Sequence, residues 1–469
     1  MLRNLIVAAA VALVGGWVVF SIGPAVADEE SENATASESS SRYSDEVVGL
    51  KEQEDLPARP VPLIELGQDY VNEGPYEHEF ELPTGMVVSP GLVVFGTANT
   101  GLEYTDNGTA DPKTEWVTTL NLFANLTLSG TERILVGMTP LSRESGAKSR
   151  LKIGPTSGYE NESRARLSTA FFEGELSEMF PGLDMDGRLP MDYEIAFGRQ
   201  AVLSQGGILI NDSMDSLALT RSTVPLPGTN FARIGGLIAV NGVHRKSNKD
   251  DINPDLFALF SEVEFHHATA ELDFVYIESE EEKGDQFNIG GSWIKQYIVF
   301  DHAVDTTTRI AQSYTPDQET AHASNGTLVY SSMAFAPKRT DNILYTNIFA
   351  ALNSYAPAAR QAGGPLGIVG LLFSGNGLHG AAINNGANDA YGGSVGYQMF
   401  FSGALRSNLI IEGGGKVDNT SGGVNRLGAQ VRYSQALGRH LFFEVGGYAV
   451  SQESMHEGYG VRTKLNIIF

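Results

Sequence analysis

The sequence predicts an all-β fold, a transmembrane antiparallel β-barrel of about 18 strands (16–20) that occupies residues 91–469. Three observations lead to this class. Segments of about ten residues that alternate between apolar and polar side chains recur from residue 91 onwards. After residue 20, no apolar run is long enough to cross a bilayer as a helix. The last residues form an amphipathic strand that stops at Phe469.

The first 27 residues have the pattern of a secretory signal peptide. Arg3 precedes an apolar run over residues 5–20, and the small residues Ala25-Val26-Ala27 supply a cleavage site. The sequence contains no cysteine, so a disulfide framework and a lipidated cysteine are both excluded. We therefore expect residues 1–27 to be removed and the mature chain to begin near Asp28.

Charge and composition set the next two segments apart from the barrel. The net charge is −24, which argues against nucleic acid as a partner because phosphates require a basic surface. Residues 28–60 carry ten acidic and three basic side chains, so we expect a disordered acidic periplasmic tail that could bind a periplasmic partner. Residues 61–90 mix polar and apolar residues and are expected to form a periplasmic segment, either a strand or a plug.

Eighteen segments have the alternation that membrane strands need. They are residues 91–104, 114–128, 132–141, 164–177, 191–203, 215–224, 231–243, 255–265, 267–278, 286–299, 304–314, 326–336, 342–355, 392–402, 407–417, 425–436, 441–451 and 459–469.

The lengths of the connections support this count. In a closed barrel with both ends in the periplasm, short turns follow even-numbered strands and long loops follow odd-numbered ones. His266 and residues 437–440 are short connections after even strands, whereas residues 142–163 follow an odd strand and are long. Residues 178–190 are the exception, because they follow an even-numbered strand and are too long for a turn.

The connection over residues 356–391 is the longest. It is rich in Gly, Asn and Ala, and it also carries apolar residues such as Leu371, Leu372 and Phe373 that would not readily lie exposed in water. Two interpretations follow. The segment either folds into the lumen as a constriction, which we favour, or adds two short strands to the wall.

The alternation also predicts which side chains face the lumen, because charged residues should point inward and apolar residues outward. In residues 164–177, one face carries Ala165, Leu167, Thr169 and Phe171, and the other carries Arg164, Arg166 and Ser168. The predicted basic residues of the lumen are Arg164, Arg166, Lys416, Arg426, Arg432, Arg462 and Lys464. The predicted acidic residues are Glu262, Glu264, Glu271, Asp273, Glu412 and Glu444. A basic and an acidic ladder facing one pore would orient charged or dipolar solutes.

The terminal strand carries a second prediction. Tyr459, Leu465, Ile467 and Phe469 lie on its outward face, and the ending resembles the C-terminal signal that outer-membrane proteins present to the barrel assembly machinery. The inward face carries Arg462 and Lys464. We therefore expect this strand to close the barrel in lipid and to line its basic side.

The sequence has no recognisable enzyme signature. It has no Gly-x-Ser-x-Gly, no His-Glu-x-x-His and no phosphate-binding loop. His266 and His267 are adjacent, so on a strand they would point to opposite faces and could not share a metal ion. We expect no catalytic residues, no metal site and no cofactor.

One stretch resembles a known family. The run from Tyr193 to Gln200, which contains Gly198-Arg199-Gln200, is followed by Gln205-Gly206-Gly207 and Asn211-Asp212. It is similar to the Gly-Arg-Gln strand of eighteen-stranded, alginate-export-type porins. The resemblance implies a monomeric barrel that passes an anionic polysaccharide through an arginine-rich lumen. Strict alternation puts Arg199 on the outward face with Phe197, so we expect Arg199 at the barrel rim or after a bulge.

Together these patterns predict an outer-membrane channel of a Gram-negative cell, which passes small hydrophilic and anionic solutes without catalysis. Its other partners would be membrane lipid and the assembly machinery. Two alternatives stay open from the sequence: a barrel that sheathes a partner such as an electron-transfer protein, and an outer-membrane hydrolase.

Overall fold

The computed structural model describes residues 60–67, 80–108, 111–143, 146–154, 157–184, 192–245, 253–280, 284–300, 302–316, 319–401 and 406–469. The signal peptide predicted over residues 1–27 and all but the last residue of the tail predicted over residues 28–60 lie outside the described residues. Within the described part of the chain, no helix is long and apolar enough to span a bilayer.

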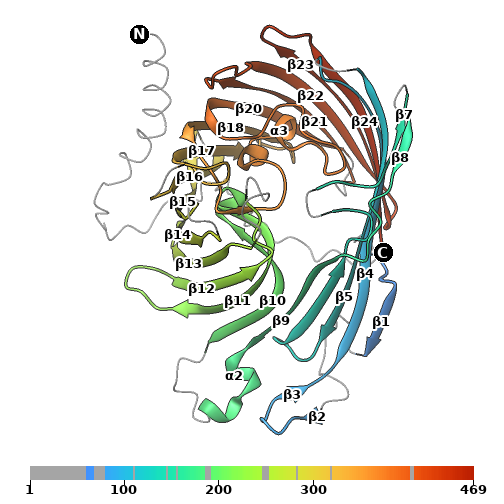
Figure 1. Ribbon diagram of the computed structural model, residues 1–469. Coiled ribbons are helices and arrows are strands. Elements are labelled where there is room, and N and C mark those ends of the chain that lie inside the picture. The colour runs from blue at the N-terminus through green and yellow to red at the C-terminus, as the bar shows by residue number, and fades with distance from the viewer. Residues whose placement is uncertain are drawn as a thin grey trace, which may run out of the picture.

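One sheet of 22 strands dominates the described residues. Four of its strands are short additions, and the other eighteen form the wall, one for each predicted segment (Figure 1). The wall strands are β4 (Gly91–Asp106), β5 (Lys113–Thr127), β6 (Arg133–Met138), β9 (Leu167–Glu175), β10 (Tyr193–Ser204), β11 (Ile210–Val224), β12 (Phe231–Asn241), β13 (Asp255–Phe265), β14 (Ala268–Glu278), β15 (Gln286–Val299), β16 (His302–Tyr314), β17 (Gly326–Phe335), β18 (Ile343–Ser354), β20 (Asn388–Phe401), β21 (Ser407–Asp418), β22 (Arg426–Leu437), β23 (Leu441–Gln452) and β24 (Gly458–Ile468).

The barrel closes between its last and first wall strands. β24 pairs antiparallel with β4, from Tyr459 opposite Asp106 to Ile468 opposite Thr97. Phe469 extends the ladder, because its N–H donates to the Gly96 carbonyl at 3.0 Å and its carbonyl accepts from the Gly96 N–H at 2.6 Å. Its ring lies over Gly96, where a Cβ would meet the ring at 2.8 Å. The predicted closing strand is confirmed.

The outer face of the wall is apolar and exposed. In β11 and β13, Leu217 and Leu259 are each 50% exposed, whereas Leu256, on the other face of β13, is fully buried. Exposed apolar side chains recur at every second position of the neighbouring strands, as with Phe274 in β14 and Ile289 in β15. A water-soluble sheet would bury such a face, so this belt fits a lipid environment.

The long connection between β18 and β20 folds into the barrel, as we favoured. It contains β19 (Ala359–Arg360), the 3₁₀ turn η4 (Pro365–Ile368) and the short helix α3 (Leu371–Ser374). Figure 1 shows α3 inside the ring of strands. Leu366, Val369, Leu372 and Phe373 are buried in one apolar cluster with lumenal side chains of the wall. The segment over residues 355–387 is called the insert below.

A second element enters the lumen at the connection between β10 and β11. Here the 3₁₀ turn η3 (Gln205–Gly207) joins the strands, with positive φ at Gln205, Gly206 and Gly207. Ile210 and Asn211, at the start of β11, pair in parallel with β19 of the insert. The Tyr355 hydroxyl donates to the Ile208 carbonyl at 3.1 Å, so the tip of this hairpin and the insert pack as one unit.

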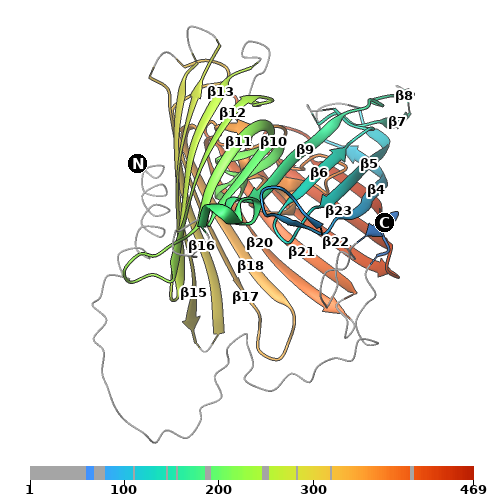
Figure 2. The same ribbon diagram turned by 90° about the horizontal axis from the view of Figure 1, so that it is seen from below.

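The remaining elements lie at the two rims. β1 (Ile64–Gly67) pairs with the beginning of β4, next to the C-terminus, and β2 (Phe80–Glu81) pairs with β3 (Val87–Val88). The long connection after β9 begins with α2 (Leu176–Met179) and η2 (Pro181–Asp184). The predicted loop over residues 142–163 instead contains β7 (Arg150–Ile153) and β8 (Gly158–Glu160), a hairpin that pairs with the start of β5. Figure 2 shows β7 and β8 at the rim beside β5.

The predicted face of residues 164–177 is wrong in part. The ladder between β6 and β9 shifts register between Gly137 and Met138, so Thr169 is the partner of Gly137 and Leu167 that of Met138. Alternation restarts after this shift. Phe172 then packs against the exposed ring of Phe197, at 5.2 Å between centroids. Phe171 therefore points into the lumen, not outward as the sequence pattern suggests.

Candidate functional site

The lumen is the candidate site, and its basic side is largely occupied by the insert. Lys464 Nζ donates to the Asn376 carbonyl at 3.1 Å, and Lys416 Nζ donates to the Gly386 carbonyl at 2.7 Å. Lys148, from the connection after β6, donates to the carbonyls of Gly377 and Leu378. These ammonium groups satisfy backbone carbonyls that the irregular insert leaves without helical or sheet partners.

Arg462 is the most deeply buried of the predicted basic residues, with 2% of its surface exposed. Its Nε lies 3.4 Å from Glu103 Oε1 on the neighbouring strand β4, and its guanidinium stacks over the Tyr448 ring at 4.6 Å. Its Nη1 also reaches the Gly380 carbonyl of the insert at 3.4 Å. Arg462 therefore joins the closing strands to the insert.

The other two predicted cations of this side contact the wall. Arg426 Nε donates to Gln452 Oε1 at 3.0 Å, and Arg432 lies 4.0 Å from Glu444. Arg426 also lines a polar hollow of about 390 Å³ beside the insert. Among the described residues, neither Arg426 nor Arg432 forms a hydrogen bond or ion pair with the insert.

Glu412 holds the helix of the insert rather than lining an open pore. Its carboxylate is 1% exposed. It accepts hydrogen bonds from the N–H groups of Leu371 and Leu372, each at 3.0 Å, and from the Tyr345 hydroxyl at 2.6 Å. A carboxylate with three donors suits this place, because it satisfies the otherwise unpaired amides at the start of α3.

The acidic residues predicted for β13 and β14 share the lumenal face. Glu262 stands opposite Glu271 in the ladder, and Glu264 opposite Thr269. Glu271 accepts from Ser292 at 2.5 Å. Asp273 accepts from Ser204 and Gln205, so it binds the hairpin tip that enters the lumen. The sequence pattern placed these carboxylates on one face but gave no sign of the tip that covers Asp273.

Arg164 and Arg166 lie before β9, not within it. Arg164 is exposed, and its N–H donates to the Pro140 carbonyl at 2.8 Å. Arg199 lies two residues after Phe197 on β10. Its Nε and Nη2 donate hydrogen bonds to the Asp215 carboxylate at 2.7 and 3.0 Å. Pairing with β9 ends at Arg199, which agrees with the predicted rim position.

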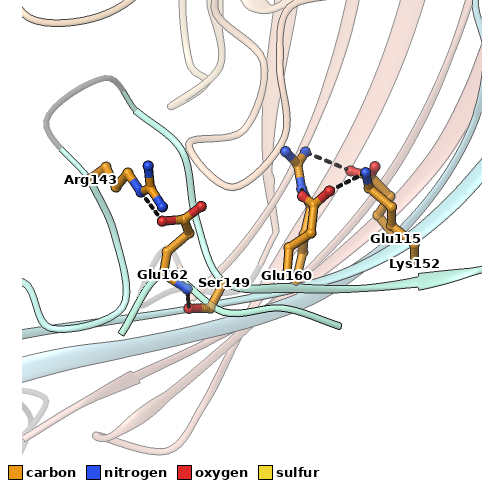
Figure 3. Close-up of polar contacts among 7 residues, drawn as sticks. Glu115, Arg143, Ser149, Lys152, Glu160 and Glu162 are labelled. Carbon is orange, nitrogen blue, oxygen red and sulfur yellow. Dashed lines mark hydrogen bonds and ion pairs between the residues drawn. The ribbon is translucent and has the colours of Figure 1, made fainter. Parts of the chain in front are cut away.

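A mixed-charge cluster marks the rim at β7 and β8 (Figure 3). Arg150 donates to Glu160 at 2.6 Å and to Glu115 at 3.2 Å, and Lys152 also binds Glu160. These hydrogen bonds, first from Lys152 and then from Arg150, lower the pKa of the Glu160 carboxyl. Arg143 binds Glu162, whose N–H donates to Ser149 at 3.0 Å. The pairs fix the hairpin against β5, although exposed ion pairs add little to stability.

Among the described residues, no group of three or more His, Asp or Glu side chains could hold a metal ion.

Fold and lumen together define a closed eighteen-stranded barrel of the transmembrane type, with an internal insert.

Comparison with solved structures agrees with this class. The chain is similar to Pseudomonas aeruginosa OccK2 (OpdF) in complex with glucuronate, with 10% identity and a TM-score of 0.56 over 81% of this chain and 98% of the other. It is similar to P. aeruginosa OpdK with vanillate, with 11% identity and a TM-score of 0.55 over 80% and 98%. It is also similar to Acinetobacter baumannii OccAB3, with 8% identity and a TM-score of 0.54 over 80% of this chain and 99% of the other. No family model and no curated protein sequence matches the chain.

Proposed function

We propose that this protein is an outer-membrane channel for passive diffusion of small, hydrophilic and predominantly anionic solutes. The observation that carries the proposal is a closed ring of strands with large apolar side chains outside and charged side chains inside. Such a ring needs lipid around it and water within it. The fold likeness to OccK2 and OpdK supports the same conclusion.

The proposed orientation places the rim with the C-terminus in the periplasm. Residues 1–27 would direct secretion, residues 28–60 would form the periplasmic tail, and residues 61–90 would lie at that rim. The outward residues Tyr459 and Phe469 would then serve as the signal that the assembly machinery reads, with Leu465 and Ile467 beside them.

The insert favours small solutes over a polymer. The alginate-export resemblance implies an anionic polysaccharide, but the insert and the hairpin tip both occupy the lumen and pack against its wall. The structures with glucuronate and vanillate contain small carboxylates. A sheath for an electron-transfer protein would need a lumen free for its partner, so the insert argues against that alternative.

Planar-bilayer recording of the purified full chain tests the proposal. We expect stepwise conductance and, in a salt gradient, a reversal potential that shows preference for anions. Arg426→Gln with Arg432→Gln should lower that preference, because these two cations do not hold the insert. Glu457→Gln, an exposed side chain in the connection between β23 and β24, is the control. A membrane-inserted, folded protein that passes no current would contradict the channel and favour the sheath or the hydrolase.

A further inference from the structure

Residues 375–382 of the insert form a loop that is called the flap below. It follows α3 and ends before Ile383, whose N–H donates to the Leu372 carbonyl at 2.9 Å. Both ends of the flap are therefore fixed in the buried apolar cluster. They also lie close together, because a Cβ on Gly375 would meet the Gly380 carbonyl oxygen at 2.7 Å. Such a loop can leave its neighbours while the rest of the insert stays folded.

Three cations hold the flap, and each does so through backbone carbonyls. The pairs are Lys464 with Asn376, Lys148 with Gly377 and Leu378, and Arg462 with Gly380. Among the described residues, only the carboxylate of Glu103 forms an ion pair with one of these cations, Arg462. Positive charge is therefore in excess around the flap. Burial, followed by the charges of Lys464 and Arg150, accordingly lowers the pKa of the Lys148 ammonium group.

His379 lies in the middle of the flap and is the one titratable side chain of residues 371–387. It is 6% exposed, and neither ring nitrogen has a hydrogen-bond partner in the part of the chain that the structure describes. The charged groups around it, from the elements packed against the flap, are Arg462 and Lys464 of β24, Lys148 of the connection after β6, and Glu103 of β4 beside Arg462. A proton on this ring would add positive charge where cations already outnumber carboxylates, and its N–H groups would have no acceptor.

We propose that the flap is a proton-operated cover of the basic side, which lies against the wall at neutral pH and leaves it in acid. This inference rests on the proposed channel. Release of the flap frees the three cations from its carbonyls. It also joins them to the hollow of about 390 Å³ that borders the flap at residues 380–382. The path along the basic side then widens, so the conductance and the preference for anions both rise.

The size of the effect follows from His379 alone. Burial, followed by the neighbouring cations, lowers the pKa of this ring to about 4 in the docked flap, whereas a ring in water has a pKa of about 6.5. The released flap therefore takes up the proton first. Docking has its full strength above about pH 6.5 and is weakened on the order of a hundredfold at about pH 4.

Bilayer currents of the full chain at about pH 7.5 and about pH 4 test the inference. We expect a second, larger conductance level whose occupancy rises in acid, with a greater preference for anions in a salt gradient. His379→Phe fills a similar space without titrating, so this variant should stay at the smaller level at both pH values. His456→Phe, at an exposed position in the connection between β23 and β24, is the control and should respond to acid as the wild type does.

Thiol labelling of the folded protein in detergent follows the movement without a current. The chain has no cysteine, so Leu378→Cys places a single thiol at a position that is 5% exposed in the docked flap. The reagent is 4,4′-dithiodipyridine, which reacts with thiols in acid, and its rate with free cysteine at each pH is the reference. We expect the relative rate to rise up to about a hundredfold between about pH 7.5 and about pH 4, and His379→Phe to remove this rise.

The outcomes separate the flap from the channel. A current that does not respond to acid would overturn the flap as a cover and leave the channel intact. An acid response that persists in His379→Phe would assign it to carboxylates such as Glu103 and would also overturn the inference. If no current is seen, the labelling decides the flap alone: a rise that depends on His379 supports it, and equal relative rates at both pH values refute it.

Discussion

The contacts of Glu412 allow one perturbation to be followed in detail. Glu412→Gln keeps the size of the side chain but replaces one acceptor oxygen by an NH₂ group. Leu372 binds one carboxylate oxygen, and Leu371 and Tyr345 bind the other. The Tyr345 hydroxyl can rotate and accept a hydrogen bond from the new NH₂ group, but the backbone N–H groups of α3 cannot. In either orientation of the new amide, at least one backbone N–H of α3 is therefore left without an acceptor.

The loss of one hydrogen bond to a charged group costs about 2 kcal/mol. If this energy falls on docking of the insert, the ratio of docked to undocked forms decreases about thirtyfold. Hydrogen–deuterium exchange of the folded protein reports this ratio directly, because amides of the insert exchange when it undocks. We expect peptides that cover residues 371–374 to exchange up to about thirtyfold faster.

Glu444→Gln serves as the matched control. Glu444 is also lumenal, but it pairs with Arg432 of the wall, at 4.0 Å, and not with the insert. Unchanged exchange over residues 371–374 in a folded Glu412→Gln protein would refute the docking role. Equal acceleration in both variants would attribute the effect to lumenal charge in general.

Three further predictions concern closure and docking. Gly96→Leu should reduce the fraction of protein that migrates as a folded barrel on semi-native gels, because a Cβ there meets the Asn121 carbonyl oxygen of β5 at 2.4 Å and the Phe469 ring at 2.8 Å. Gly236→Leu should be tolerated, because the nearest atom is 4.0 Å away. Equal yields of the two variants would contradict the close packing of β5 and the C-terminal residue against β4. Arg462→Met should leave Glu103 buried without its cation and destabilise the barrel by about 3 kcal/mol in a melting experiment, and an unchanged melting temperature would show that the pair contributes nothing. Burial, followed by the charges of Arg462, Lys148 and Lys464, lowers the pKa of His379 to about 4. The undocked insert therefore takes up a proton more readily, and docking should weaken by up to about 3 kcal/mol as the pH falls from 6.5 to 4. Hydrogen–deuterium exchange over residues 376–380 should accelerate in this window, and His379→Phe should abolish that pH dependence.

Much of the wall could be predicted from the sequence because alternation along a strand is a local property. Each side chain points to the face opposite its neighbour, so a strand that separates lipid from water must repeat with a period of two. All eighteen segments appear as wall strands for this reason. The faces of the terminal strand could also be predicted locally, because apolar and polar side chains alternate from Val461 to Phe469.

Tertiary contacts decided the rest. The β9 faces changed because a single register shift inverts every later residue. The roles of Lys464 and Glu412 depend on residues 376 and 371–372, which reach them only through the fold. The sequence therefore determined that this chain forms a barrel with a charged interior. Only the tertiary structure decided that part of this charge holds the insert and which charged groups remain for a solute, because a carbonyl and a cation far apart in the chain meet only when the ring has closed around them.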